Sequence, residues 1–144
     1  MAGVVLAERY RVEGVLGEGG MAVVFDGHHL GLDRASALKV LRPAFVADPQ
    51  IRARFEQEAR AVSRLEHPGI VKMFDVGTAE VPGLLTPIAF LVMERLRGVE
   101  LSDLLRDDGP APAALALSWL EEMLAAIAHA HTRGVVHRDL KPEN

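Results

Sequence analysis

The segment HRDLKPEN, residues 137–144, places a base, a cation and a metal-binding amide on one short stretch of chain. Asp139 carries the carboxylate, Lys141 the ammonium group and Asn144 the amide. Phosphoryl transfer requires groups of these kinds, because that reaction needs positioning and the neutralisation of anionic oxygens more than covalent help from the protein. The segment therefore predicts a phosphoryl-transfer site on a single loop.

This segment resembles the catalytic loop of eukaryotic-type (Hanks-type) protein kinases, H-R-D-x-x-x-x-N, and includes the lysine that marks the Ser/Thr branch. The resemblance implies that Asp139 accepts the proton of the substrate hydroxyl and that Lys141 lies against the transferring phosphate. It also implies that Asn144 holds Mg²⁺ and that Arg138 is the partner of a phosphorylated activation loop. ATP with Mg²⁺ would then be required, and the partner would be a protein that offers Ser or Thr.

A second segment, GEGGMAVV at residues 17–24, resembles the Gly-rich loop G-x-G-x-x-G-x-V of the same family, with Ala22 in place of the third glycine. Glycines are needed where backbone amides approach phosphate oxygens closely. Alone, this motif is weak and is more often a plain hairpin turn, but Lys39 of Ala37-Leu38-Lys39 follows at the family's distance. The residues implied to bind ATP are Leu16, Gly17, Glu18, Gly19, Gly20, Met21, Ala22, Val23, Val24, Ala37, Lys39, Met93, Glu94 and Leu96.

Lys39 and Glu58 are candidates for an ion pair. The period of two in residues 36–41 places Lys39 on the same face as Ala37. Glu58 falls within the apolar stripe of a helix predicted for residues 49–65, where a lone buried charge would cost several kcal/mol. It therefore either turns to solvent or has a cationic partner, and each residue taken alone is more often exposed. The stripe consists of Ile51, Phe55, Val62 and Leu65.

The family resemblance favours the pair. RFEQEA followed by LEHPGIV, residues 54–59 and 65–71, is similar to the C helix and its exit in bacterial kinases, which implies that Glu58 pairs with Lys39 and that Lys39 holds the α- and β-phosphates. FLVMERLRG, residues 90–98, resembles the fifth strand and the hinge. Met93 would lie beside the adenine, and the backbones of Glu94 and Leu96 would bond to it. Apolar walls would come from Leu16, Val24 and Ala37.

The expected fold is α+β, because a strand-rich first half precedes a helix-rich second half. Strands are predicted at residues 10–16, 22–27, 36–41, 70–76 and 88–93, and helices at 49–65, near 102–106 and from about 112 to just before Gly134. With the resemblance, residues 10–97 form a complete kinase N-lobe and hinge, a five-stranded antiparallel sheet plus the C helix. Residues 98–144 begin the helical C-lobe and end at the catalytic loop. The last helix is apolar on more than one side, which predicts burial all round.

Composition is ordinary for a globular protein, with 49% apolar and 25% charged residues among 144. A net charge of −4, from 16 basic and 20 acidic residues, does not indicate the positively charged surface that nucleic-acid binding requires. The absence of cysteine excludes disulfides and suits a cytoplasmic location. We expect no membrane segment in this chain, although a longer protein that contained it could be membrane-anchored.

Family segments that contribute a further metal ligand (D-F-G), the activation loop and A-P-E do not occur in these residues. The sequence therefore predicts the front portion of an ATP-dependent Ser/Thr protein kinase that is weakly active or inactive by itself. The alternative is a non-catalytic nucleotide-binding or interaction module, in which a partner chain or a second copy covers the long helix.

Overall fold

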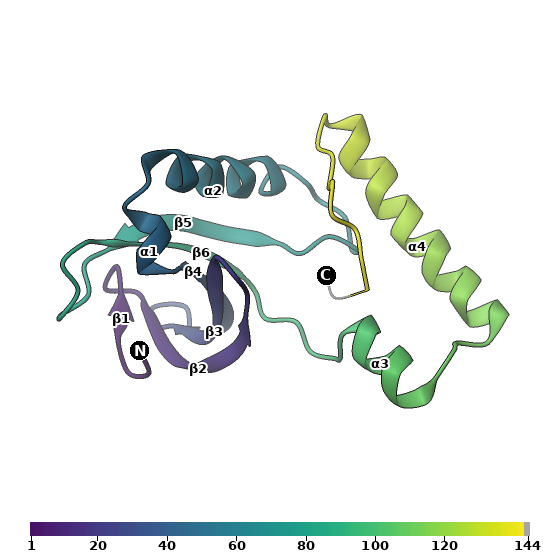
Figure 1. Cartoon of the computed structure of the whole chain (residues 1–144), viewed down its shortest axis with the longest axis horizontal. Helices are drawn as coiled ribbons and strands as arrows, with labels where there is room; N and C mark the ends of the chain where they lie inside the picture. Colours follow the sequence, from purple (N-terminus) through teal and green to yellow (C-terminus); the bar gives the residue numbers. More distant parts are fainter. Residues whose placement is uncertain (143–144) are drawn as a thin grey trace. The chain divides into compact units, whose positions relative to one another are not determined.

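The computed structural model describes residues 1–142 of the chain. The chain divides into two compact units, Met1–Arg64 with Val71–Leu96, and Leu65–Ile70 with Arg97–Asn144. The first unit contains the strands and two helices, and the second contains two further helices, as Figure 1 shows. The elements are β1 (Val5–Leu6), β2 (Tyr10–Glu18), β3 (Ala22–His29), β4 (Arg34–Leu41), α1 (Pro43–Val46), α2 (Pro49–Val62), β5 (Met73–Ala79), β6 (Ile88–Glu94), α3 (Leu101–Asp108) and α4 (Ala113–Thr132).

The sheet is antiparallel, with strand order β1-β2-β3-β4-β6-β5. The α+β class and the five predicted strands are confirmed, but β1 adds a sixth strand, in which Val5 lies opposite Arg11. β5 begins at Met73 rather than Ile70, because the Ile70 N–H bonds back to the His67 carbonyl at 3.0 Å and closes a turn there. The three predicted helices are confirmed with shifted ends: α2 stops three residues early at Val62, α3 is longer than expected, and α4 is one residue shorter at each end. The short α1 was not predicted.

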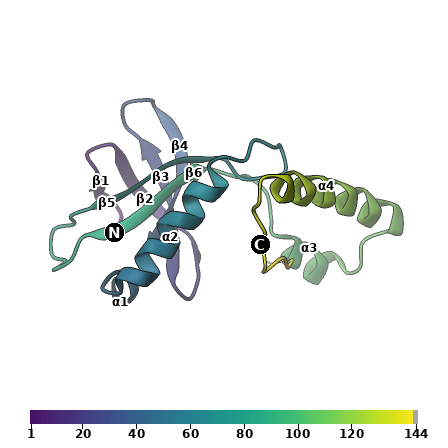
Figure 2. The same ribbon diagram turned by 90° about the horizontal axis from the view of Figure 1, so that it is seen from above.

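Each face of the sheet has its own apolar core. On one face, Leu38 and Val40 of β4 pack in a cluster with Phe25 and Phe90. On the other face, Leu41 belongs to a cluster that includes residues of α2, which lies along the sheet in Figure 2. Full burial of such a side chain contributes about 1.5–3 kcal/mol. The alternation predicted for residues 36–41 is thus confirmed, and it fixes which side chains β4 presents beside α2.

α2 begins at a side-chain cap and packs through a narrower stripe than the sequence predicted. Oδ1 of Asp48 accepts the Gln50 N–H at 2.8 Å, and proline occupies the first turn. The buried residues of α2 are Phe55 and Ala59, four positions apart, and Glu58 is exposed. Of the two alternatives for Glu58, exposure to solvent or a cationic partner, the structure shows exposure, because Ala59 rather than Glu58 completes the buried stripe.

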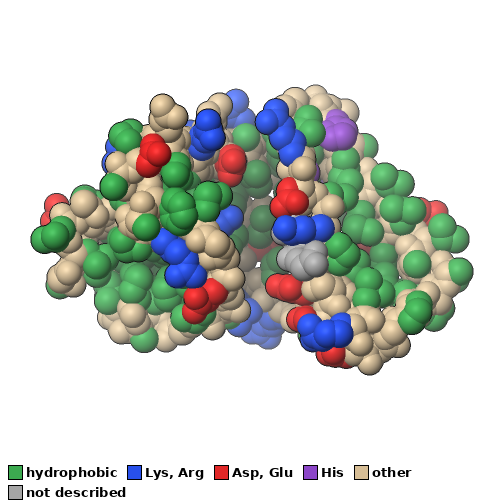
Figure 3. Space-filling model, viewed as in Figure 1, with side chains coloured by type: hydrophobic (Ala, Val, Ile, Leu, Met, Phe, Trp, Pro, Cys, Tyr) green, Lys and Arg blue, Asp and Glu red, His purple; other side chains and the backbone are tan. Residues whose placement is uncertain are grey.

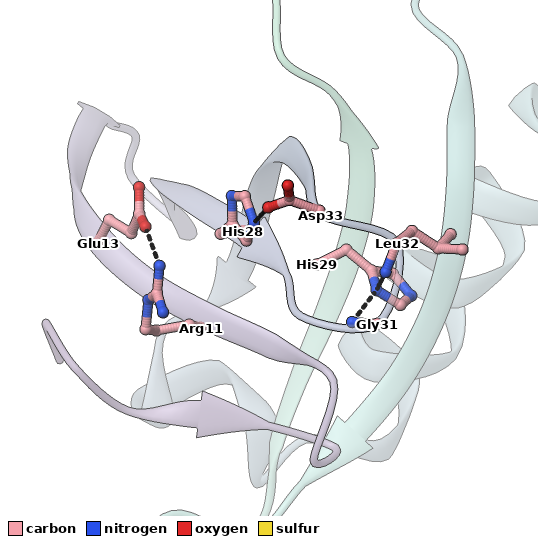
Figure 4. Close-up of polar contacts among 7 residues, drawn as sticks. All are labelled: Arg11, Glu13, His28, His29, Gly31, Leu32 and Asp33. Atoms are coloured by element: carbon pink, nitrogen blue, oxygen red, sulfur yellow. Dashed lines mark hydrogen bonds and ion pairs between the residues drawn. The ribbon is translucent and has the colours of Figure 1, made fainter.

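The connection between β3 and β4 is held by side-chain contacts, which Figure 4 shows together with the neighbouring Arg11–Glu13 pair of β2. His28 Nε2 lies 2.8 Å from Asp33 Oδ1, and His29 Nδ1 accepts the N–H groups of Gly31 and Leu32 at 3.2 Å each. These bonds satisfy backbone donors that the turn would otherwise leave to solvent. β3 and β4 therefore pair in one uninterrupted register from this turn to their far ends.

α4 differs most from its prediction. Its apolar side chains are largely exposed, at 60% for Leu117 and 53% for Leu124, and only Ala126 is buried. Hydrophobic side chains are correspondingly visible over this part of the surface in Figure 3. Burial all round is thus wrong for residues 1–142, because little of the described chain packs on this helix. By length and composition alone α4 could also cross a membrane, a property that core helices of soluble proteins share.

Candidate functional site

The pairing of the central strands brings four of the predicted site residues to one face of the sheet. Val24 of β3 lies opposite Lys39 of β4, and Ala37 of β4 lies opposite Met93 of β6. Residues directly opposite each other in an antiparallel pair share a face. Ala37 is buried, whereas the Lys39 side chain is exposed. A small buried residue, two partly buried apolar residues and an accessible cation therefore form a surface that suits a flat apolar group joined to an anion.

The Gly-rich segment forms the end of the β2–β3 hairpin, as predicted. Gly17 lies opposite Val24, and the Gly19 N–H bonds to the Ala22 carbonyl at 2.9 Å. A Cβ atom added at Gly17 or Gly20 would meet nothing within 4 Å. The backbone is thus open to an approaching ligand at these two positions. Ala22 is buried, so that its contribution to a ligand site would come from its backbone.

Lys39 and Glu58 are not joined in this structure. Both side chains are exposed, and no ion pair between them occurs within residues 1–142. The packing of Phe55 and Ala59 against the sheet orients α2 so that Glu58 lies outside the buried stripe. The geometry does not form the expected pair, and the roles of the two residues remain predictions from the family resemblance.

The end of β6 and the two residues after it are anchored by polar contacts that the sequence did not reveal. The Glu94 N–H bonds to the Lys72 carbonyl at 2.9 Å, and Glu94 Oε1 accepts the Lys72 N–H at 2.8 Å. Nε of Arg95 donates to Asp26 Oδ1 at 2.9 Å, and Nη1 donates to the Leu96 carbonyl. Arg95 therefore ties this segment to β3.

The predicted catalytic loop lies in the second unit, where it follows the end of α4. Gly134 adopts φ +74° and donates its N–H to the His131 carbonyl at 2.9 Å, which ends the helix. Farther along, Lys141 Nζ lies 3.2 Å from Asp139 Oδ2. The Pro142 carbonyl accepts the Ser102 N–H of α3 at 3.0 Å. The structure thus brings together two of the three predicted catalytic groups of this loop, and Asn144 lies outside the described residues.

Arg138, beside the predicted base, has an uncommon backbone conformation. Its φ is +64°, in the left-handed region that residues other than glycine seldom adopt. The Asp139 N–H approaches His137 Nδ1 at 3.4 Å. Such conformations cost of the order of 1–3 kcal/mol and cluster at functional sites. The loop therefore combines the predicted residues with a backbone that differs from an ordinary surface turn.

His67 lies against His129 of α4. The rings of His67 and His129 have centroids 5.2 Å apart, and Nε2 of His129 is buried without a hydrogen-bond partner among the described residues. Desolvation lowers the pKa of His129, and the nearby Arg133 and His67 lower it further, while Glu66 acts in the opposite direction. No sequence pattern indicates this contact, because the two rings are far apart along the chain.

Comparisons with known proteins agree with these motifs. Residues 10–144 match the family model described as protein kinase domain. The serine/threonine-protein kinase pkn3 of Myxococcus xanthus is 42% identical over 142 residues, which are 99% of this chain and 25% of that protein. PknB of Mycolicibacterium smegmatis is 39% identical over 139 residues, 96% of this chain and 22% of that protein, and PrkC of Bacillus subtilis is 38% identical over 139 residues, 96% and 20%.

Solved structures give the same result for the fold. The crystal structure of the PknI kinase domain of Mycobacterium tuberculosis matches with a TM-score of 0.80 and 34% identity, over 100% of this chain and 56% of that chain. The fold predicted from the resemblance is therefore confirmed. The chain spans a quarter or less of the length of these curated relatives, at 25%, 22% and 20%, and somewhat more than half of the solved kinase domain.

Proposed function

The chain belongs to the protein kinase family, and we propose that it supplies the nucleotide-binding sheet and the catalytic loop for phosphoryl transfer from ATP to Ser or Thr hydroxyls of proteins. The observation that carries the proposal is the sheet face on which Val24, Ala37, Lys39 and Met93 lie together. The family reaction needs this combination, because the adenine requires apolar walls and the phosphates require a cation and free backbone amides.

In the proposed reaction the substrate hydroxyl oxygen forms a bond to the γ-phosphorus while the bond from that phosphorus to the β–γ bridging oxygen of the leaving ADP breaks. Asp139 accepts the hydroxyl proton, and Lys141 neutralises charge on the transferring group. The 3.2 Å contact between these side chains supports the assignment, because it places both on the same short stretch of the loop. Backbone amides of the Gly-rich loop and the Lys39 ammonium group would hold the remaining phosphates.

Asn144 is the predicted Mg²⁺ ligand of this chain, and it lies outside residues 1–142. Asp139, which is proposed as the base, is not assigned to the metal. Magnesium typically takes one or two protein ligands together with substrate phosphates. Bound there with ATP, it would neutralise the charge that develops on the phosphate oxygens.

The unformed ion pair between Lys39 and Glu58 is consistent with an inactive arrangement of a kinase. In protein kinases the pair between the third-strand lysine and the C-helix glutamate must form for activity, and the position of that helix controls it. We infer that the present arrangement of α2 is one in which the pair is open, and that Glu58 reaches Lys39 when α2 turns about its Phe55–Ala59 stripe. Lys39→Met would then reduce transfer more than Glu58→Gln, because Lys39 is proposed to hold the phosphates as well as to pair with Glu58.

The protein substrate and the cellular location are also proposals. PknB, PrkC and pkn3 are named serine/threonine-protein kinases, which supports a Ser/Thr-containing protein as the substrate. The family match includes α4, which supports its assignment as a helix of the kinase domain rather than a membrane span. The domain would accordingly act in the cytoplasm, where ATP is available.

The test compares binding and transfer in the protein that carries this chain. Asp139→Asn should lower phosphate incorporation from γ-labelled ATP into a Ser/Thr-containing protein by about 10²–10⁴-fold, the range typical of general-base catalysis. Its affinity for ATP, measured by calorimetry, should stay near that of the wild type. Equal loss of binding and transfer would show that Asp139 is not the base.

A second candidate is a non-catalytic nucleotide-binding or interaction module completed by another chain. The exposed apolar side chains of α4 favour it, because a partner or a second copy could cover them. ATP binding with no phosphate transfer under any activating condition would support this candidate. Measurable transfer that depends on Asp139 would exclude it.

A further inference from the structure

Arg42, the residue directly after β4, bonds to three residues of the Gly-rich hairpin. Its backbone N–H donates to the Met21 carbonyl at 2.9 Å. Its side chain donates through Nε to the Gly19 carbonyl at 3.1 Å and through Nη2 to Glu18 Oε2 at 2.9 Å. One arginine therefore contacts both sides of the loop whose amides are proposed to approach phosphate.

These contacts constrain a segment that is otherwise free to move. Glycine has more backbone freedom than any other residue, and both Gly17 and Gly20 have open space around the Cβ position. A phosphate site built from backbone amides works only if those amides already point at the ligand, because ordering them on binding would cost affinity. A cation bound to the Gly19 carbonyl and the Glu18 carboxylate supplies that order without blocking the amides.

Arg42 also links the loop to the strand that carries Lys39, since only three positions separate the two residues along the chain. We propose that Arg42 is a positioning residue for the nucleotide phosphates, which fixes the Gly-rich loop relative to Lys39 so that both address the same phosphate chain. This inference rests on the proposed function, because it assumes that a nucleotide occupies the sheet face.

The chemistry of the side chain supports this role over a general contribution to folding. The guanidinium group presents Nε and Nη2 as two donors in a fixed fork, which a lysine cannot reproduce. The Arg42 side chain is 37% exposed and that of Glu18 62%. Pairs as exposed as this contribute little to overall stability, so that a variant should remain folded.

The experiment compares ligands that differ only in their phosphates. Calorimetric titrations with adenosine, and with ADP and ATP in the presence of Mg²⁺, are made on the wild type, Arg42→Met, Arg42→Lys and Glu18→Gln. Arg52→Met is the matched control, because it removes one positive charge from the exposed side of α2 and does not change the Gly-rich loop. Thermal unfolding of each variant verifies that it is folded.

Arg42→Met should weaken ADP and ATP binding by about 3- to 10-fold, the effect expected from losing two charge-assisted hydrogen bonds that are partly exposed. Adenosine affinity should remain unchanged, Arg42→Lys and Glu18→Gln should lie between the extremes, and Arg52→Met should match the wild type. Equal effects on adenosine and ADP, no effect on either, or tighter ADP binding would overturn the positioning role.

Amide hydrogen exchange without nucleotide separates this inference from the proposed function. Exchange at residues 19–22 should be faster in Arg42→Met than in the wild type, and unchanged exchange would overturn the inference even if nucleotide binds. A wild type that shows slow exchange at these amides but binds neither adenosine nor ADP would instead contradict the proposed function and, with it, the phosphate role assigned to Arg42.

Discussion

One methyl group added at Gly27 of β3 should destabilise the sheet, because it would collide with Leu38, and the cost can be estimated. A Cβ atom there would lie 2.5 Å from Leu38 Cδ1 and 2.6 Å from its Cγ, distances that real Cβ atoms essentially never show. Leu38 is fully buried in the cluster with Phe25 and Phe90, so it cannot turn away without displacing its neighbours. Overpacking of this kind typically costs about 1–3 kcal/mol.

The reduced freedom of the unfolded chain offsets part of that cost. Replacing glycine by alanine at a compatible position stabilises a protein by about 0.4–1 kcal/mol. Taking the midpoints of these ranges, the expected net effect of Gly27→Ala is a loss of about 1.3 kcal/mol in the free energy of unfolding. Urea denaturation followed by circular dichroism measures it as a lower midpoint with an unchanged slope.

Gly14→Ala in β2 is the matched control, because a Cβ at Gly14 would meet nothing within 4 Å. This variant should be as stable as the wild type or slightly more stable. If Gly27→Ala unfolded at the same urea concentration as Gly14→Ala, Leu38 would not occupy the space that the structure gives it, and the packing of β3 against β4 would have to be revised.

Three further predictions concern polar contacts. Tyr10→Phe should lower the free energy of unfolding by about 1 kcal/mol, because the Tyr10 hydroxyl donates to Asp75 Oδ2 at 2.8 Å. Burial, together with this bond, raises the pKa of Tyr10 to about 12, so the contribution of the hydroxyl to stability is present below pH 10 and is lost as pH rises through about 12. A melting curve identical to that of the wild type would refute the bond. Acidification from pH 7 to pH 5 should destabilise the wild type more than His129→Phe, because the pKa of His129 is lowered in the folded state. The contribution of His129 to stability is present above the pKa of the unfolded state and is lost as pH falls through the pKa of the folded state. Parallel pH profiles of the two proteins in thermal unfolding would contradict this. For Arg95→Met and Asp26→Asn, a double-mutant cycle in urea should give a coupling of about 0.5–1 kcal/mol, and strict additivity would mean that the 2.9 Å contact contributes nothing.

The sheet could be predicted from sequence because its signals are local. Alternation placed Lys39 and Ala37 on one face, and the structure confirms that face through the opposing residues Val24 and Met93. The position of Glu58 could not be predicted from the same kind of count. Alanine carries a weak hydrophobic signal, so the pattern did not reveal that residue 59 completes the buried stripe of α2.

The contacts of the arginines were also beyond the sequence pattern. Arg42 meets Glu18 across 24 positions, and Arg95 meets Asp26 across 69, so neither contact exists until the strands are in register. The exposure of α4 has a different origin. Its composition indicates a buried helix, but burial depends on neighbouring segments, which an apolar pattern within the helix does not specify.

The most direct test of the account follows backbone amide resonances by NMR while Mg²⁺ and ATP are added to the chain. If this sheet face holds the nucleotide, shifts should concentrate at residues 17–24, around Ala37 and Lys39, and at residues 93–96, and the same shifts should be reduced in Lys39→Met. Saturating ATP that left these amides unmoved, or that moved amides only on the opposite face around Leu38 and Phe90, would contradict the claim that this face of the sheet holds the nucleotide.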